Sequence, residues 1–291
     1  MIDRDMQAVG RDDYGNLPTA LDDAQLRELA RAIRVESVRM IHRARSSHLG
    51  SCLSMADIMA VLYGCIMRFR PADPTWADRD RLIVSKGHAA AATYATLAEA
   101  GFMPRKRLEE FGRDSSVFAG HVTHGVPGVE VSTGSLGHGL PIATGMALAA
   151  RRSRAAWRVF AVLSDGELDE GSNWEAFMFA AHHGLDNLTA VIDYNGIQSL
   201  DTVEKTLRLE PLRAKLESFG WRVLDVDGHD VRALRQALDR ATASTGRPTA
   251  VIARTIKGKG VRFMEGKVLW HYRPPDDAEM AAAVDELGAG E

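Results

Sequence analysis

Hydrophobic residues in the first part of the chain recur at three- and four-residue steps between positions 21 and 44. This is the spacing of one face of an α-helix, and Asp22 or Asp23 is available as its N-cap. The periodic apolar positions are Leu26, Leu29, Ala30, Ile33, Val38 and Ile41. A second helix is predicted over 54–67, after the loop SSHLGSC. The first eighteen residues lack this pattern, and we expect a loose N-terminal arm over 1–18.

Further along, short runs of β-branched and apolar residues are bounded by turn residues, which is the pattern of buried strands. These runs lie at 81–85, 158–164, 188–194, 221–226 and 248–255. Helical windows alternate with them, at 88–100, 138–152, 172–183, 211–219 and 230–242. Such alternation predicts an α/β fold with a parallel sheet and helices on both faces. We expect one domain over 19–272, followed by a polar surface tail over 273–291 with a short helix at 276–286.

The composition points to a small-molecule partner. The chain has 291 residues, 45% of them apolar and 26% charged, which is ordinary for a globular protein. Its formal net charge is −3, with basic and acidic residues interspersed, so no basic stripe is available for nucleic acid or an anionic membrane. Cys52 and Cys65 match neither a disulfide framework nor a zinc-site spacing, and we interpret both as small buried side chains.

The N-terminal sequence MIDRDMQAVGRDDYGNLP is too polar and acidic for a signal peptide. No apolar run in the chain approaches the roughly 18 residues that a membrane-spanning helix needs. We therefore expect a cytoplasmic protein with no membrane partner.

Two polar residues directly follow predicted strands. Asp165 comes after the strand at 158–164, and Asn195 comes after the strand at 188–194. Ligands of open parallel sheets bind beyond the carboxyl ends of the strands, so neighbouring strands would bring this acid and amide together. With a nearby backbone carbonyl they would suit a magnesium ion and a diphosphate, which Gly166 would let approach closely. The alternative is that Asp165 caps a helix and Asn195 forms a turn.

Several segments extend this pattern to a known family. The stretches SDG at 164–166, EG at 170–171, EA at 175–176 and YNGI at 194–197 resemble the thiamine diphosphate motif. Four longer stretches resemble the diphosphate-binding domain of transketolase, and the resemblance covers about 20–272. These are SSHLGSCLSMADIMAVLY at 46–63, DRLIVSKGHAAAATYATL at 80–97, GHVTHGVPGVEVSTGSLGHGLPIATGMALA at 120–149 and TIKGKGVRFM at 255–264.

The resemblance implies the thiamine diphosphate-binding fold and one half of an enzyme. A complete transketolase also has a pyrimidine-binding domain and a C-terminal domain, so this chain resembles the N-terminal subunit of a split, two-subunit transketolase. The implied reaction transfers a two-carbon ketol unit from a ketose phosphate to an aldose, with thiamine diphosphate and magnesium, or calcium in its place. The implied partner is a separate C-terminal subunit, in a heterotetramer, or with this chain as a homodimer.

The resemblance also implies roles for individual residues. The implied catalytic residues are His48, His88, His121, His271 and Glu170. The implied cofactor contacts are His88, Gly134, Leu136, Asp165, Gly166, Glu170, Asn195, Ile256 and His271. The implied metal ligands are Asp165, Asn195 and Ile197. Glu170 would join a carboxylate network that reaches the partner's glutamate.

Some residues and interpretations stay outside this assignment. We interpret His182, His183 and His229 as structural, and Glu167 has no role in the scheme. One alternative function is a subunit of another thiamine diphosphate enzyme, such as a 2-oxo acid dehydrogenase, against which the four matching histidines argue. The other alternative is a catalytically silent thiamine diphosphate-binding protein that has lost its partner.

Overall fold

Five parallel strands form the centre of the computed structural model, which describes residues 20–289. Their order is β1-β2-β3-β5-β4, so the strands that precede Asp165 and Asn195 are neighbours. The predicted parallel sheet is confirmed, and the predicted arm over 1–18 lies outside the described residues. The strands are β1 (Arg81–Val84), β2 (Val159–Ser164), β3 (Leu188–Tyr194), β4 (Arg222–Asp227) and β5 (Thr249–Arg254).

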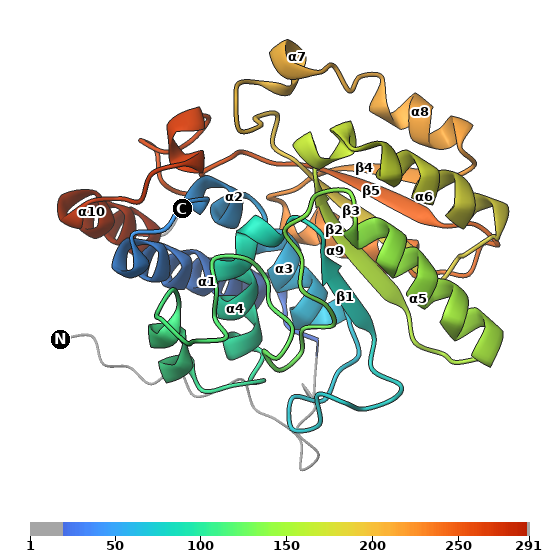
Figure 1. Cartoon of the computed structure of the whole chain (residues 1–291), viewed down its shortest axis with the longest axis horizontal. Helices are drawn as coiled ribbons and strands as arrows, with labels where there is room; N and C mark the ends of the chain where they lie inside the picture. The colour runs from blue at the N-terminus through green and yellow to red at the C-terminus, as the bar shows by residue number, and fades with distance from the viewer. Residues whose placement is uncertain (1–19, 290–291) are drawn as a thin grey trace.

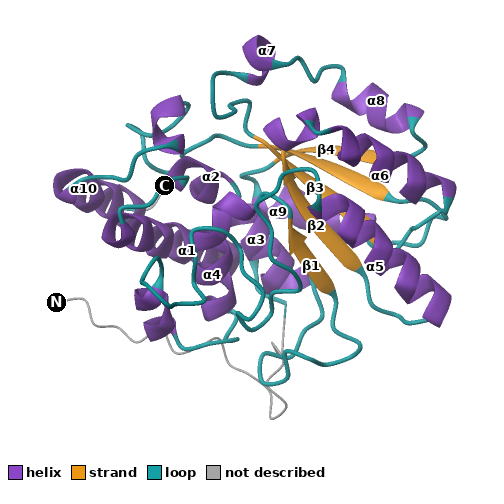
Figure 2. Cartoon of the chain, in the orientation of Figure 1, coloured by secondary structure: helices purple, strands orange, loops and turns teal. Residues whose placement is uncertain are grey.

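Helices cover both faces of this sheet, as Figures 1 and 2 show. Alternate residues of each strand point to opposite faces and enter two separate hydrophobic clusters. Phe160 and Val162 of β2 pack on the side of the helices at 23–44, 56–61, 90–99 and 231–241, whereas Ala161 and Leu163 pack on the side of the helices at 139–153, 171–182 and 212–218. Because both faces are buried, the central strands β2, β3 and β5 are largely apolar runs, whereas the edge strand β4 has exposed positions.

The helices follow the predicted windows closely. The capping box of Asp22 and Gln25 fixes the start of the first helix. The α-helices are α1 (Asp23–Ala44), α2 (Leu49–Ser54), α3 (Ala56–Val61), α4 (Ala90–Glu99), α5 (Gly139–Ser153), α6 (Gly171–His182), α7 (Val203–Thr206), α8 (Leu212–Ser218), α9 (Val231–Ala241) and α10 (Asp277–Gly288). The other helical turns are η1 (Leu62–Ile66), η2 (Gly87–Ala89), η3 (Arg105–Glu110), η4 (Gly166–Asp169) and η5 (Val268–His271).

The helix predicted over 54–67 is present over 56–66, but its start and its continuity differ from the prediction. The helical segment begins at Leu49, inside the predicted loop, and is divided into α2, α3 and the π-helical turn η1. All residues of α2 and α3 are buried, so the segment has no polar face. Without amphipathic periodicity the sequence does not mark where such a helix starts or breaks.

The C-terminal segment is more than the surface tail that the sequence suggested. Helix α10 lies against α1 in Figure 1, and its Ala283 and Leu287 are buried in the same cluster as α1. His42 on α1 also contacts Asp277, with 2.8 Å between Nε2 and Oδ1. The polar composition of 273–291 hid this packing because only one face of the helix is apolar.

Two further expectations can be compared with the structure. Both cysteines are free thiols, and Cys52 is buried as predicted while Cys65 is only partly buried. Among residues 20–289, no helix has the length and apolar composition needed to cross a bilayer.

A buried carboxylate anchors the edge of the sheet at the N-terminal end of β1. Asp80 is fully buried and accepts hydrogen bonds from the side chains of Arg68 and Arg158, at 3.0 Å and 2.6 Å. It also accepts from the backbone N–H groups of the same two residues, each at 2.8 Å. Burial alone would raise the pKa of Asp80, but these bonds outweigh it and hold the pKa below its ordinary value.

We predict that Asp80→Asn lowers the free energy of unfolding by about 3 kcal/mol at pH 7, because it leaves two arginines without their buried counter-charge. A carboxyl group with a lowered folded-state pKa stabilises above its unfolded pKa, and that stability is lost as the pH falls below about 4. Urea unfolding at pH 7 and pH 3 should therefore show a smaller pH effect in the variant. Asp78→Asn, at an exposed position of the same loop, is the control. Equal pH effects in wild type and Asp80→Asn would contradict the prediction.

Candidate functional site

The ends of β2 and β3 bring Asp165 and Asn195 together, as the parallel pairing requires. Ser164, the last residue of β2, is in register with Asp193 of β3. Asp165 is only 1% exposed, and its Oδ2 accepts a hydrogen bond from Gly196 N at 2.6 Å. This bond joins the two strand ends directly, across thirty residues of sequence.

A cavity of about 250 Å³ opens at this edge of the sheet. Most of the residues predicted from the resemblance line it. They are His48, His88, His121, Gly134, Leu136, Asp165, Gly166, Asn195, Ile197 and His271. The remaining lining residues are Ser164, which belongs to the SDG motif, and Ser51, Gln198, Ser199 and Lys257, which the sequence did not single out.

Four histidines from distant parts of the chain meet on one wall of the cavity. The ring of His48 lies 5.2 Å from that of His88, 5.6 Å from that of His121 and 4.9 Å from that of His271, between centroids. His48 has a left-handed backbone, with φ 76°, at the residue that precedes α2. A non-glycine residue in this conformation is uncommon, and among the described residues Arg45, Ser115 and Arg154 share it.

The surroundings of three of these histidines, His48, His88 and His271, favour the neutral imidazole. Burial, together with the positive charges of neighbouring groups, lowers the pKa of His48 to about 4. Burial and Lys257 lower the pKa of His271 to about 3, and burial and Lys86 hold the pKa of His88 well below its ordinary value. A neutral imidazole has one donor and one acceptor nitrogen, so the wall can both give and accept hydrogen bonds.

Two of the predicted site residues lie outside the cavity lining. Glu170 is exposed and directly precedes α6. Its Cβ lies close to Gly137, because a Cβ built on Gly137 would be 2.6 Å from the Cβ of Glu170. Ile256 is 40% exposed. Gly171, which follows Glu170 in the motif, begins α6 in open space, whereas Gly166 begins the 3₁₀ turn η4 directly after Asp165.

Lys257 is the most informative residue that the sequence analysis missed. It is 2% exposed, and its Nζ donates to the carbonyl of Ile197 at 2.9 Å and to Nδ1 of His271 at 3.0 Å. Burial lowers the pKa of Lys257 to about 8, against the attraction of Asp165. The residue lies in the stretch TIKGKGVRFM, but a lysine among glycines carries no signal of burial by itself.

Ser51 is a second missed residue. Its Oγ lies 2.9 Å from Nε2 of His88. It belongs to α2, which the sequence analysis assigned to a loop, so the helical turn that points it at His88 was not foreseen.

A buried ion pair lies next to the cavity. Lys86 and Asp193 are both fully buried and form a salt bridge, and Asp193 also accepts hydrogen bonds from Ser54, at 2.6 Å, and from Thr255. Burial would raise the pKa of Asp193, but the Lys86 ammonium outweighs it and holds the pKa below its ordinary value. The pair connects the helical layer to the ends of β3 and β5.

Glu167 also has a structural explanation. Its buried carboxylate accepts hydrogen bonds from Ser85 Oγ and from the backbone N–H groups of Gly137, at 3.0 Å, and Ser164, at 3.3 Å. It therefore fixes the loop GSLGHG, which carries Gly134 and Leu136, to the end of β2.

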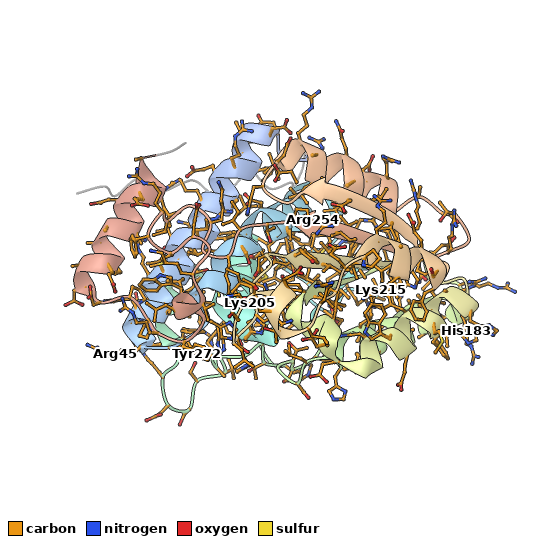
Figure 3. The ribbon with its side chains drawn as sticks, turned by 90° about the horizontal axis from the view of Figure 1, so that it is seen from above. Arg45, His183, Lys205, Lys215, Arg254 and Tyr272 are labelled. Carbon is orange, nitrogen blue, oxygen red and sulfur yellow. The ribbon has the colours of Figure 1, made fainter. Side chains whose placement is uncertain are left out.

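The histidines that we interpreted as structural lie away from the cavity lining. His183, at the end of α6, is at the opposite end of the molecule from Tyr272, which follows His271 (Figure 3). His229 does not line the cavity either, and its ring is hydrogen-bonded on both nitrogens.

The residues at the strand ends fit a hard cation beside a diphosphate. Within the described residues, no cluster of three or more His, Cys, Asp or Glu could hold a metal. The expected site instead combines one carboxylate, one amide oxygen and one backbone carbonyl, all oxygen donors of the kind magnesium takes, with phosphate oxygens completing the shell. Burial and repulsion from Asp193 raise the pKa of Asp165 to about 6, and a cation there would stabilise its ionised form.

Two glycines of the cavity wall lie where a side chain would collide with neighbouring residues. A Cβ at Gly134, which has φ 146°, would lie 2.9 Å from His121 Cδ2, and one at Gly166 would lie 3.0 Å from Gln198 Cγ. Lys257 supplies a positive charge that suits phosphate oxygens.

Comparison with known families and proteins gives a consistent result. Residues 25–290 match the family model described as transketolase, thiamine diphosphate binding domain. The match includes α10, which supports the packing of the C-terminal segment as part of the same unit.

Individual relatives cover the chain almost completely. An apulose-4-phosphate transketolase subunit of Phocaeicola vulgatus is 38% identical over 254 residues, 87% of this chain and 90% of that protein. The 6-deoxy-6-sulfo-D-fructose transketolase subunit of Clostridium sp. (strain MSTE9) is 38% identical over 90% of this chain and 96% of its own length. The crystal structure of transketolase from Campylobacter jejuni superposes with a TM-score of 0.87 at 32% identity, over 92% of this chain but only 43% of that one.

We predict that Asp193→Asn lowers the free energy of unfolding by about 3–5 kcal/mol, because it leaves the Lys86 ammonium buried without its counter-charge. The double variant Lys86→Met/Asp193→Leu removes both charges and should recover most of this loss. Urea unfolding monitored by circular dichroism measures both. A double variant that is as unstable as Asp193→Asn would show that shape, and not charge, is what the pair provides.

Proposed function

The chain belongs to the transketolase family, and from this premise we propose that it is the thiamine diphosphate-binding subunit of a two-subunit transketolase. The proposed reaction moves a two-carbon ketol unit from a ketose phosphate to an aldose or aldose phosphate. The observation that carries the proposal is the convergence of Asp165, Asn195 and four histidines on one cavity, in a chain that its subunit relatives match over nearly their whole length.

The strand ends would hold the cofactor's diphosphate and its cation. Asp165, Asn195 and the carbonyl of Ile197 would bind magnesium, or calcium, and Lys257 would face the phosphate oxygens. When bound, thiamine diphosphate supplies the electron sink for cleavage and formation of the carbon–carbon bond. Gly134, Leu136, Gly166 and Ile256 are proposed as further contacts.

The histidine wall would orient the sugar. The imidazole nitrogens of His48, His121 and His271 can form hydrogen bonds with the hydroxyl groups of a ketose, and the same nitrogens can move a proton at these hydroxyls. His88, hydrogen-bonded to Ser51, would lie beside the diphosphate. Because Lys257 donates to His271 Nδ1, the proton of the neutral His271 imidazole is on Nε2, which would act as a donor to the sugar.

A separate partner subunit would complete the active site. The chain spans 43% of the Campylobacter jejuni transketolase, and two of its relatives are themselves described as subunits. We propose that the partner carries the pyrimidine-binding and C-terminal domains, in a heterotetramer in the cytoplasm. Glu170, exposed in this chain, would then join the partner's glutamate in a shared carboxylate network.

The donor sugar is the open part of the proposal. The relatives' names include a transketolase of apulose 4-phosphate and one of 6-deoxy-6-sulfo-D-fructose. Substrates of this kind belong in the test beside the common pentose and heptulose phosphates.

We predict that the purified chain has no transketolase activity alone and acquires it when mixed with its partner, thiamine diphosphate, magnesium, a ketose phosphate and an aldose. The physical reason is that this chain supplies only the diphosphate half of the site. The measurement is a coupled assay across a panel of ketose donors. Release of carbon dioxide from a 2-oxo acid by the same mixture would favour the 2-oxo acid dehydrogenase alternative, and cofactor binding without any turnover would favour the silent binder.

We predict that Asp165→Asn weakens magnesium-dependent binding of thiamine diphosphate to the mixed complex. Removing a residue that is hydrogen-bonded to a metal ligand costs about 10- to 100-fold in metal affinity. Removing the ligand itself should therefore weaken magnesium-dependent cofactor binding by at least about 100-fold. Isothermal titration calorimetry with and without magnesium measures the effect. Asp201→Asn, in the loop after Asn195 but outside the cavity lining, is the control. Unchanged affinity in Asp165→Asn would contradict the proposed metal site.

A further inference from the structure

His229 lies at the turn between β4 and α9, outside the cavity, yet both nitrogens of its ring are engaged. Its Nδ1 lies 2.7 Å from Oδ2 of Asp57, and its Nε2 accepts a hydrogen bond from the backbone N–H of Ile256 at 2.8 Å. The side chain is 12% exposed. An ordinary surface histidine would not be held at both ends in this way.

These two contacts fix the proton on the ring. A backbone N–H only donates, so Nε2 must be unprotonated, and the proton of the neutral imidazole is on Nδ1. Nδ1–H therefore donates to the Asp57 carboxylate. A carboxylate that selects one tautomer of a histidine, so that the far nitrogen is available as an acceptor, is a familiar way of orienting a functional group.

Asp57 is held from the opposite side by a buried arginine. Arg34 on α1 forms a salt bridge with the Asp57 carboxylate, and both side chains are less than 10% exposed. Arg34 Nε also donates to the carbonyl of Leu53 at 3.2 Å. The line Arg34, Asp57, His229 and Ile256 N thus connects the helical layer to the segment that follows β5.

The segment after β5 carries Lys257, whose side chain lines the cavity. Ile256 is followed by Lys257, whose Nζ reaches the Ile197 carbonyl and His271. On the other side of Ile256, Thr255 N donates to the carbonyl of Tyr194 at 3.0 Å. Between these two contacts, the ring of His229 anchors the backbone.

The turn that bears His229 is pressed against the same segment. Gly228 N donates to the carbonyl of Arg254 at 2.7 Å, and a Cβ on Gly228 would lie 2.3 Å from Thr255 Cγ2. Only glycine at position 228 lets these two segments of the chain approach this closely. The short approach places His229 where its ring reaches Ile256 N.

We propose that His229 is a positioning residue of the active site. It holds the backbone of Ile256 and thereby sets the place of Lys257 in the cofactor cavity, with Arg34 and Asp57 fixing its orientation. The inference rests on the proposed function for what the cavity binds, but its geometric part concerns only residues of this chain.

Two substitutions separate the two ends of the ring. In His229→Asn the amide can still donate to Asp57 from the place of Nδ1, but nothing reaches Ile256 N. In His229→Gln the amide oxygen can take the place of Nε2 and accept from Ile256 N, while Asp57 loses this donor. His183→Asn, at the far end of the molecule, is the matched control.

The first readout is hydrogen exchange of the Ile256 and Lys257 amides, measured on the full chain without cofactor. Loss of one hydrogen bond of ordinary strength should speed exchange about 5- to 10-fold in His229→Asn and much less in His229→Gln. The second readout is binding of thiamine diphosphate with magnesium to the complex with the partner, which should weaken about 5- to 10-fold in His229→Asn and be largely restored in His229→Gln.

Equal exchange at Ile256 in wild type, His229→Asn and His183→Asn would overturn the proposal. It would also be overturned if exchange rose in His229→Asn while cofactor affinity stayed at the wild-type value. Failure of the wild-type complex to bind thiamine diphosphate would refute the proposed function instead, and the exchange comparison would still decide whether His229 holds the segment. Thermal unfolding separates these effects from a general loss of stability. His229→Gln, which removes the donor to the buried Asp57, should lower the melting temperature more than His229→Asn, so low stability cannot explain weaker cofactor binding in His229→Asn.

Discussion

The hydrogen bond from Gly196 N to the Asp165 carboxylate joins the ends of two neighbouring parallel strands, and the whole site depends on that junction. Parallel strands share their direction, so their carboxyl ends meet at one edge, and each loop that leaves the edge begins beside the others. The loops with Asn195 and Lys257, which follow β3 and β5, have this geometry, and the segment before α5 brings Gly134 to the same cavity. Residues 166–194, between Asp165 and Asn195, form the turn η4, the crossover helix α6 and the strand β3, so the separation of the two residues in sequence is the length of one crossover unit.

Buried charge is the second constraint on this edge of the sheet. Lys86, Asp193, Asp165 and Lys257 all lie under or beside the cavity with almost no exposure. Charges without water are tolerated only when each has partners, and here one serine, one threonine and backbone groups are among these partners. The same partners keep the side chains in fixed positions, as binding of a cation and a diphosphate requires.

The family relationship and the geometry explain each other. The chain spans nearly the whole length of its subunit relatives and 43% of the Campylobacter jejuni transketolase. It supplies the histidine wall and the strand ends of the cavity, and Glu170 is exposed beside the loop that carries Gly137. The organisation that we propose, with a second chain completing the site, gives the exposed Glu170 carboxylate a role.

The sequence by itself determined the sheet, its covering helices and most of the cavity residues, because buried parallel strands are continuous apolar runs and the motif residues lie in matching segments. It did not determine the start of α2, the packing of α10 or the burial of Lys257. In α2 and α3 every residue is buried, so no periodicity marked their ends. Lys257, Ser51 and His229 acquire their roles only from partners distant in sequence, and such pairings exist only once the tertiary structure has brought the elements together.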